Sequence, residues 1–113
     1  MYFRPLRRLE VLEYLVGAGA NIEARNLQGA TPLHSAASSD KSGSSTALLL
    51  YAGARFDVVD VEGWTPLHTA AAFANTVAMQ HLLNAGADLH VRDVNGFTPA
   101  DLAEGALVKL LGP

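Results

Sequence analysis

Four histidines are the residues of this chain best suited to metal binding or acid–base chemistry: His34, His68, His81 and His90. A zinc site needs three or four side chains that converge on one point. His34 and His68 occupy the same place in a stretch that occurs twice, and stacked units would hold equivalent residues about 10 Å apart. One ion cannot bridge that distance, so no metal site and no cofactor are predicted. We expect His81 to be partly covered on a helix and His90 to be exposed.

Carboxylates offer a second possible chemistry, since Asp57, Asp60 and Glu62 gather in one segment and Asp88 and Asp93 in another. A hydrolase requires paired carboxylates in a cleft that shifts their pKa values. Both segments are typical of loops open to water, so a weak cation site is the most that they suggest. The chain has no cysteine, no glycine-rich phosphate loop and no serine-elbow motif. The sequence therefore predicts a protein that is not an enzyme.

A repeated stretch supplies the elements that position these residues. Gly-Trp-Thr-Pro-Leu-His-Thr-Ala-Ala, residues 63–71, recurs almost unchanged as Gly-Ala-Thr-Pro-Leu-His-Ser-Ala-Ala, residues 29–37. A degenerate third copy, Gly-Phe-Thr-Pro-Ala-Asp-Leu-Ala, occupies residues 96–103, and the three threonines are 34 and 33 residues apart. A Gly-Ala pair that starts at residues 19, 53 and 86 keeps the same spacing. Two patterns with one period indicate a single supersecondary unit that is used several times.

Each copy is expected to begin a helix. Its threonine is a good N-cap residue, and the proline that follows fits the first turn, where a missing N–H is harmless. The apolar pattern predicts helices over residues 65–72 and 76–84, the second capped by Asn75 or Thr76. Residues 9–16 carry an apolar stripe at helical spacing, which predicts a further helix before the first copy.

The period and the Thr-Pro-Leu-His signature resemble the ankyrin repeat, a unit of about 33 residues. The resemblance covers nearly the whole chain. It implies an all-α solenoid, a stack of antiparallel helix pairs with protruding β-hairpin-like loops. The single domain, residues 1–113, then divides into an N-terminal partial repeat (1–28), two repeats (29–62 and 63–95) and a shortened C-terminal capping repeat (96–113). We expect two short helices in that last repeat, over residues 98–104 and 106–111.

Structural roles follow from the same resemblance. In the ankyrin family the motif histidine hydrogen-bonds to the motif threonine and to the backbone of the next repeat. In this chain that role would fall to Thr31 with His34 and to Thr65 with His68. In the last copy Asp101 stands where histidine is usual. Three further motif residues are expected to take the strained turn position of the loops: Gly29, Gly63 and Gly96.

The resemblance also implies a function, because ankyrin repeats mostly bind other proteins through the loop tips and the concave face of the first helices. Residue by residue, that surface comprises Leu27, Gln28, Ala30, Ser38, Ser39, Val61, Glu62, Trp64, Ala72, Phe73, Val94, Asn95 and Phe97. Trp64, Phe73 and Phe97 are expected to form one aromatic ridge, since large aromatic residues are frequent interface hot spots. The alternative is that Trp64 and Phe97 lie flat over neighbouring loops and stabilise them.

Two features depart from the family pattern. Residues 38–45 are polar and serine-rich, where family members have Gly-His and an aliphatic helix start. We expect a mobile loop there, a second helix restricted to residues 46–51 and a locally weak repeat. A plain solvated loop is favoured over a phosphorylated switch. Asn21 and Arg55 stand where aspartate is usual, which affects the regularity of the first full repeat more than the fold.

Composition restricts the partner and the compartment. The net charge of −3 and the pI of about 5.7 disfavour nucleic acid, which needs a basic surface. No apolar run approaches the length of a membrane span, and the N-terminus lacks the pattern of a signal peptide. The sequence thus predicts an intracellular, cytoplasmic protein, and a nuclear location stays open.

The expected function is a non-enzymatic interaction module or scaffold whose partner is another, unidentified protein. The alternative is a fragment or self-associating structural array of a larger ankyrin-repeat protein. In that case the open N-terminal end, with the apolar residues Tyr2, Phe3 and Leu6, would pack on further repeats or on another copy.

Overall fold

The computed structural model describes residues 21–111, with side chains up to Gly105. This part of the chain forms five α-helices and no strand. The helices are α2 (Pro32–Ser39), α3 (Ser44–Tyr51), α4 (Pro66–Ala72), α5 (Thr76–Ala85) and α6 (Pro99–Leu111). The helix predicted over residues 9–16, and the apolar residues Tyr2, Phe3 and Leu6, lie outside the described residues.

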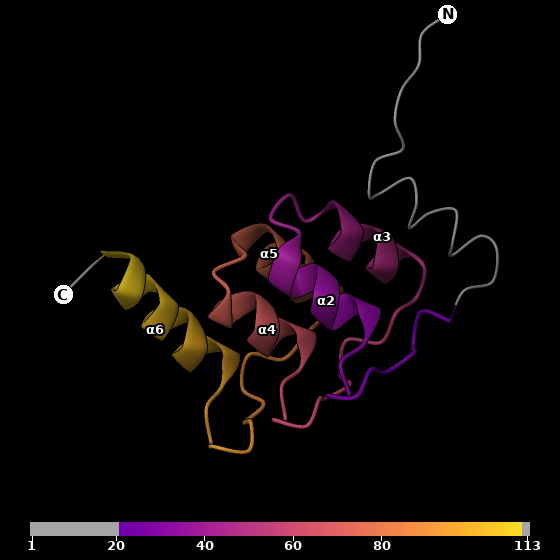
Figure 1. Ribbon diagram of the computed structural model, residues 1–113. Helices are drawn as coiled ribbons and strands as arrows, with labels where there is room; N and C mark the ends of the chain where they lie inside the picture. Colours follow the sequence, from indigo (N-terminus) through magenta and orange to yellow (C-terminus); the bar gives the residue numbers. More distant parts are fainter. Residues whose placement is uncertain (1–20, 112–113) are drawn as a thin grey trace, which may run out of the picture.

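The helices stack in two layers (Figure 1). In the first layer α4 lies between α2 and α6 and contacts both. In the second layer α3 and α5 contact each other, and each also packs on the helix that precedes it. The loops that lead into α2, α4 and α6 project together from one side of the stack (Figure 1). The predicted all-α solenoid of helix pairs with protruding loops is therefore confirmed.

The core lies between the two layers. Leu33, Leu49, Leu67 and Leu82 contribute one side chain from each of the first four helices, and each is at most 1% exposed. Burial of a leucine side chain stabilises the fold by about 2 kcal/mol. Small residues fill the remaining contacts and let the helices approach closely: Ala36, Ala37, Ala70, Ala71 and Ala78.

The serine-rich loop is shorter than the sequence predicted. Helix α2 continues through Ser38 and Ser39, whose hydroxyls both donate to the carbonyl of Ser35. Helix α3 already begins at Ser44, so only residues 40–43 connect the two helices. The predicted loop over residues 38–45 is therefore wrong at both ends. The physical reason is that helical serines can satisfy their hydroxyls on the preceding turn, so they need no loop.

The remaining four-residue connection is fixed by hydrogen bonds. Asp40 accepts the Ser42 hydroxyl at 2.6 Å and the Ser45 amide at 3.0 Å, and thereby caps α3 from outside the helix. The bond from Ser42 is the main reason why the pKa of Asp40 falls to about 2. On the other side, the Asn75 side-chain amide donates to the carbonyls of Ala37 and Asp40. These bonds do not fit the mobile loop that the sequence predicted.

The last repeat also differs from the prediction. Residues 99–111 form the single helix α6, where two short helices were expected. Gly105 lies inside it, and glycine costs only about 1 kcal/mol relative to alanine in a helix interior, which is too little to end the helix. Helix α6 packs along α4 and does not contact α5, and within residues 21–111 no helix follows α6. Leu83 on α5 accordingly remains 37% exposed.

Candidate functional site

The first motif histidine joins two repeats. The Thr31 amide donates to His34 Nδ1 at 3.1 Å, and the Thr31 hydroxyl accepts the His34 amide at 3.4 Å, so the pair forms a capping box at α2. His34 Nε2 lies 2.7 Å from the Trp64 carbonyl in the next loop. An amide can only donate and a carbonyl can only accept, so the ring is neutral with its proton on Nε2. Burial lowers the pKa of His34 and favours that neutral form.

The second motif histidine repeats this arrangement one unit later. The Thr65 amide donates to His68 Nδ1 at 3.1 Å, and His68 Nε2 lies 3.0 Å from the Phe97 carbonyl. Both rings are buried and both nitrogens of each ring are used. The two histidines therefore serve as links between repeats, and neither has a nitrogen left for a metal ion or a substrate.

Asp101 performs half of the histidine's role in the last copy. The Thr98 amide donates to Asp101 Oδ2 at 3.0 Å, and the Asp101 amide donates to the Thr98 hydroxyl at 3.2 Å. Hydrogen bonds from Thr98 lower the pKa of Asp101. The carboxylate thus completes the cap of α6, but it has no N–H that could donate to the backbone carbonyl of another repeat, as Nε2 of the motif histidine does.

The loop tips share a feature that the sequence analysis missed. At Asn26, Asp60 and Asp93 the side-chain Oδ1 accepts two backbone N–H groups, from the residues two and four positions later. All six distances lie between 2.8 and 3.0 Å. Each side chain therefore holds its own turn closed. The signal was available, because these residues are 34 and 33 positions apart and all are Asn or Asp.

The tips are also bonded to one another. The Val61 amide donates to the Gln28 carbonyl at 2.9 Å, and the Val94 amide donates to the Glu62 carbonyl at 3.0 Å. The approach is close, since a Cβ added at Gly63 would lie 2.9 Å from the Val94 nitrogen. The three loops therefore form one continuous, bonded edge of the molecule.

Three aliphatic side chains stand out from this edge. Leu27 is 97% exposed, Val61 66% and Val94 68%, and we call these three residues the tip row. Phe73, at the end of α4, and Phe97, in the third loop, are each about half exposed. These five are the large apolar residues among the sequence-predicted binding residues that water still reaches freely.

Trp64 behaves differently from Phe73 and Phe97. Its indole N–H donates to Asp93 Oδ2 at 2.9 Å, and its ring stacks on His68 with centroids 6.5 Å apart. Within residues 21–105 no ring stacks on Phe73 or Phe97. The structure therefore agrees with the alternative for Trp64, which lies over its neighbours and links two loops. The aromatic ridge of Trp64, Phe73 and Phe97 stays a prediction.

The other residues of the predicted surface divide by exposure. The exposed ones are polar and lie at the tips or at the end of α2: Gln28, Ser39, Glu62 and Asn95. The half-buried ones are small and pack against the scaffold: Ala30, Ser38 and Ala72. The structure thus brings tip residues of all three loops together, while the first-helix residues contribute less accessible area than predicted.

Two of the five loop carboxylates are less open to water than the sequence suggested, while Asp57, Glu62 and Asp88 are exposed as expected. Asp93 is 8% exposed and Asp60 is half-buried. Burial by itself would raise the pKa of Asp93, but hydrogen bonds from the Phe97 amide, the Trp64 indole and the Asn95 amide outweigh it and lower the pKa. Because these donors already occupy its oxygens, Asp93 has little capacity left for a cation. No group of His, Cys, Asp or Glu suited to metal binding occurs in the described part of the chain.

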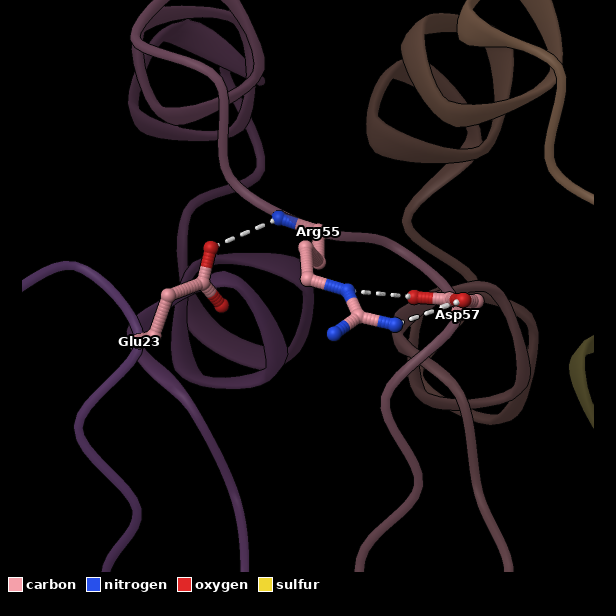
Figure 2. Close-up of polar contacts among 3 residues, drawn as sticks. All are labelled: Glu23, Arg55 and Asp57. Carbon is pink, nitrogen blue, oxygen red and sulfur yellow. Dashed lines mark hydrogen bonds and ion pairs between the residues drawn. The ribbon is translucent and has the colours of Figure 1, made fainter.

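Arg55 compensates locally for the aspartate that it replaces (Figure 2). Its guanidinium contacts both carboxylate oxygens of Asp57, at 3.2 and 3.1 Å, and its backbone amide donates to Glu23 Oε2 at 2.9 Å. Asn21 and Asp88, at the same place in the neighbouring repeats, instead accept the amide of the residue two positions later. Arg55 and Asp57 are both more than 60% exposed, so their ion pair stabilises the fold by less than about 1 kcal/mol.

Comparisons with known proteins give the family. No curated protein matches the chain significantly. None of the helices within residues 21–111 has the length and apolar character needed to cross a bilayer. The family model described as ankyrin repeats (3 copies) matches residues 5–93 and 40–111, which together span nearly the whole chain. Ankyrin repeats are generally protein–protein interaction modules and are typically non-enzymatic. The matched residues and the bonded repeats of the structure agree, and the chain belongs to the ankyrin-repeat family.

Proposed function

We propose that this chain is a non-enzymatic interaction module that binds another protein through its loop tips and the adjoining concave face of the first helices. The observation that carries the proposal is the tip row, three aliphatic side chains that are 66–97% exposed on loops whose backbone is internally bonded. The three side chains stand on successive tips that are bonded to one another, and apolar residues gathered on one surface are typical of interaction sites.

Rigidity supports the same proposal. Each tip is closed by Asn26, Asp60 or Asp93, and adjacent tips are joined by backbone bonds. A surface that is already ordered loses little conformational entropy when a partner binds. Phe73 and Phe97 extend the apolar area beside the tips, and half-exposed aromatic residues are good candidates for hot spots.

The test compares three variants that carry changes at exposed positions. The first replaces the tip row (Leu27→Ser, Val61→Thr, Val94→Thr), and the second replaces both aromatics (Phe73→Ser, Phe97→Ser). The control is Tyr51→Ser, since Tyr51 is 91% exposed but lies on α3 in the second helix layer. Circular dichroism first establishes that all three remain helical, and quantitative capture from cell extract then compares their bound proteins.

The expected result is one or more partners that the wild type and Tyr51→Ser retain and that both surface variants lose. If every captured protein binds the surface variants as well as the control, the proposal is wrong. If the tip-row variant unfolds, single changes at Leu27 and Val94 provide the same comparison, because these two side chains contribute least to packing.

Self-association through the N-terminal end remains a separate prediction. It depends on Tyr2, Phe3 and Leu6, which lie outside the described residues, so no contact of the structure favours it. Light scattering over a wide range of concentrations tests it directly, and a constant monomer mass would contradict it.

A further inference from the structure

The backbone of the loop tips offers few hydrogen bonds to a partner. The amides of residues 28, 62 and 95 donate to Asn26, Asp60 and Asp93, and the amides of Val61 and Val94 donate to neighbouring tips. A partner that binds by adding a β-strand depends on such amides for its affinity. Since these donors are already used, the tips fit a partner whose own backbone groups are satisfied internally, as in an α-helix.

The spacing of the tip row also matches a helix. The helices that carry the loops pack side by side, and packed helices lie about 8–10 Å apart, so successive tips have a similar separation. Seven residues of an α-helix rise about 10.5 Å and return to nearly the same face. A helix laid along the edge would therefore place residues i, i+7 and i+14 against Leu27, Val61 and Val94.

The charge of the protein surface indicates which side chains should flank the apolar face of the partner helix. Residues 21–105 contain nine acidic and four basic residues. Arg55 is paired with Asp57, whereas Lys41 and Arg92 donate to the carbonyls of Phe73 and Gly96 and keep their charge. The fourth, Arg25, is exposed on the first loop, so acidic side chains still outnumber basic ones around the tips. Glu62 is exposed at the middle tip, directly after Val61. A basic side chain beside the central apolar residue of the partner would meet this carboxylate.

From these three observations we infer that the partner segment is an amphipathic α-helix with an apolar residue at every seventh position, at least three times, and Lys or Arg beside the middle one. The inference rests on the proposed function, since it names the kind of partner that the same surface binds.

Two displayed peptide libraries of equal length test the inference on the full chain. One library randomises the exposed positions of an 18-residue helix, and the other randomises an extended, proline-containing scaffold. The expected result is enrichment of helices with apolar residues at i, i+7 and i+14 and a basic residue beside i+7. Their affinity should fall by at least about tenfold in the tip-row variant and stay unchanged in Tyr51→Ser. Glu62→Lys should weaken the same peptides and favour acidic ones.

Each other outcome decides against the helical partner, and the last one decides against the proposed function as well. Extended peptides that depend on the tip row would overturn the helical partner and leave the proposed function standing. Enriched helical peptides that lack apolar residues at seven-residue spacing would also overturn the proposed partner and leave the proposed function standing. If neither library yields a peptide whose binding responds to the tip-row changes, both the helical partner and the binding role of the tips are wrong.

Discussion

The first helices of the two full repeats are alike, but their second helices differ. Helix α5 is capped by the Asn75 side chain, and Ala78 fills its buried face without a polar atom. The N-cap of helix α3 is Gly43, which has no side chain to cap it, and the helix buries Ser45 and Thr46, whose hydroxyls have no hydrogen-bond partner. From this difference we infer that the repeated motif determines where each repeat begins. The second helix determines how stable that repeat is.

The weaker repeat depends on the stronger one. Asn75 belongs to the second repeat, yet its amide satisfies the carbonyls of Ala37 and Asp40 at the end of α2. Late carbonyls of a helix have no partner inside that helix, so an external donor is needed when they are buried. The first repeat therefore gains part of its stability from its neighbour, as expected in a stack of short repeats.

The largest effect is predicted for Asn75→Ala. This change removes the cap of α5 and leaves two carbonyls of the first repeat without a donor, so the free energy of unfolding should fall by about 3 kcal/mol. Urea unfolding followed by circular dichroism measures it. Asn84→Ala, an exposed change on the same helix, serves as the control and should cost less than 0.5 kcal/mol, roughly the usual surface effect. Equal losses in the two variants would contradict the link between repeats.

A second comparison uses two glycines of the first repeat. Both have positive φ, +76° at Gly43 and +93° at Gly53, so alanine is strained at either position. A Cβ at Gly43 would also lie 2.4 Å from Val77 Cγ1, whereas nothing lies within 4 Å at Gly53. Gly43→Ala should therefore lower the free energy of unfolding by about 2 kcal/mol, and Gly53→Ala by about 1 kcal/mol. If thermal or urea unfolding ranks the two the other way, the packing of α3 on α5 is not as described.

The buried hydroxyls of α3 predict stabilising changes. Thr46→Val replaces the unpartnered hydroxyl by a methyl group of the same shape, and Ser45→Ala removes the unpartnered hydroxyl, so each should raise the free energy of unfolding by about 1 kcal/mol. Ala78→Ser, the reverse change on α5, should lower it by a similar amount. Comparing the urea midpoints of the three variants with that of the wild type measures these changes. A loss of stability in Ser45→Ala would mean that its hydroxyl has a partner.

The smallest effect concerns pH. Burial lowers the pKa of His34 in the folded chain below its ordinary value of 6.5, so between these two pKa values the unfolded chain binds more protons. The contribution of His34 to the free energy of unfolding is therefore fully present above pH 6.5, and it is lost as the pH falls below that value. Urea unfolding at pH 7.5, 6.5 and 5.5 should show this slope, which should be smaller in His34→Gln and kept in Tyr51→Ser, an exposed change that leaves every histidine in place. An equal slope in His34→Gln would assign the effect to other groups.

The sequence predicted the features whose chemistry is local. Thr31 and Thr65 cap their helices through atoms three residues away, so the motif alone was enough. For α5 the sequence left Asn75 and Thr76 open, and the structure has Asn75 as the cap. The stack followed from the period of 33–34 residues. Histidine links could be expected only through the family resemblance, since they join residues about one repeat apart.

The features that the sequence did not predict depend on longer contacts. The orientation of Trp64 is set by Asp93, 29 residues later, and the start of α3 by the carboxylate of Asp40 across the turn. The continuous helix α6 could not be told from two short ones, because Gly105 permits either. Exposure of the candidate surface was equally hard to judge, since Leu27 and Trp64 are both large and apolar but only one is held by a neighbour.

The closed turns at Asn26, Asp60 and Asp93 have a consequence for how this protein can change over time. These three side chains satisfy the turn backbone, and a glycine takes the positive-φ position of each turn, so Leu27, Val61 and Val94 need neither a special conformation nor a particular side chain. Mutations at Leu27, Val61 or Val94 can therefore accumulate at almost no thermodynamic cost. Selection can then exchange one specificity for another while the scaffold stays as it is, and a laboratory library confined to these positions would explore new partners with most of its members folded.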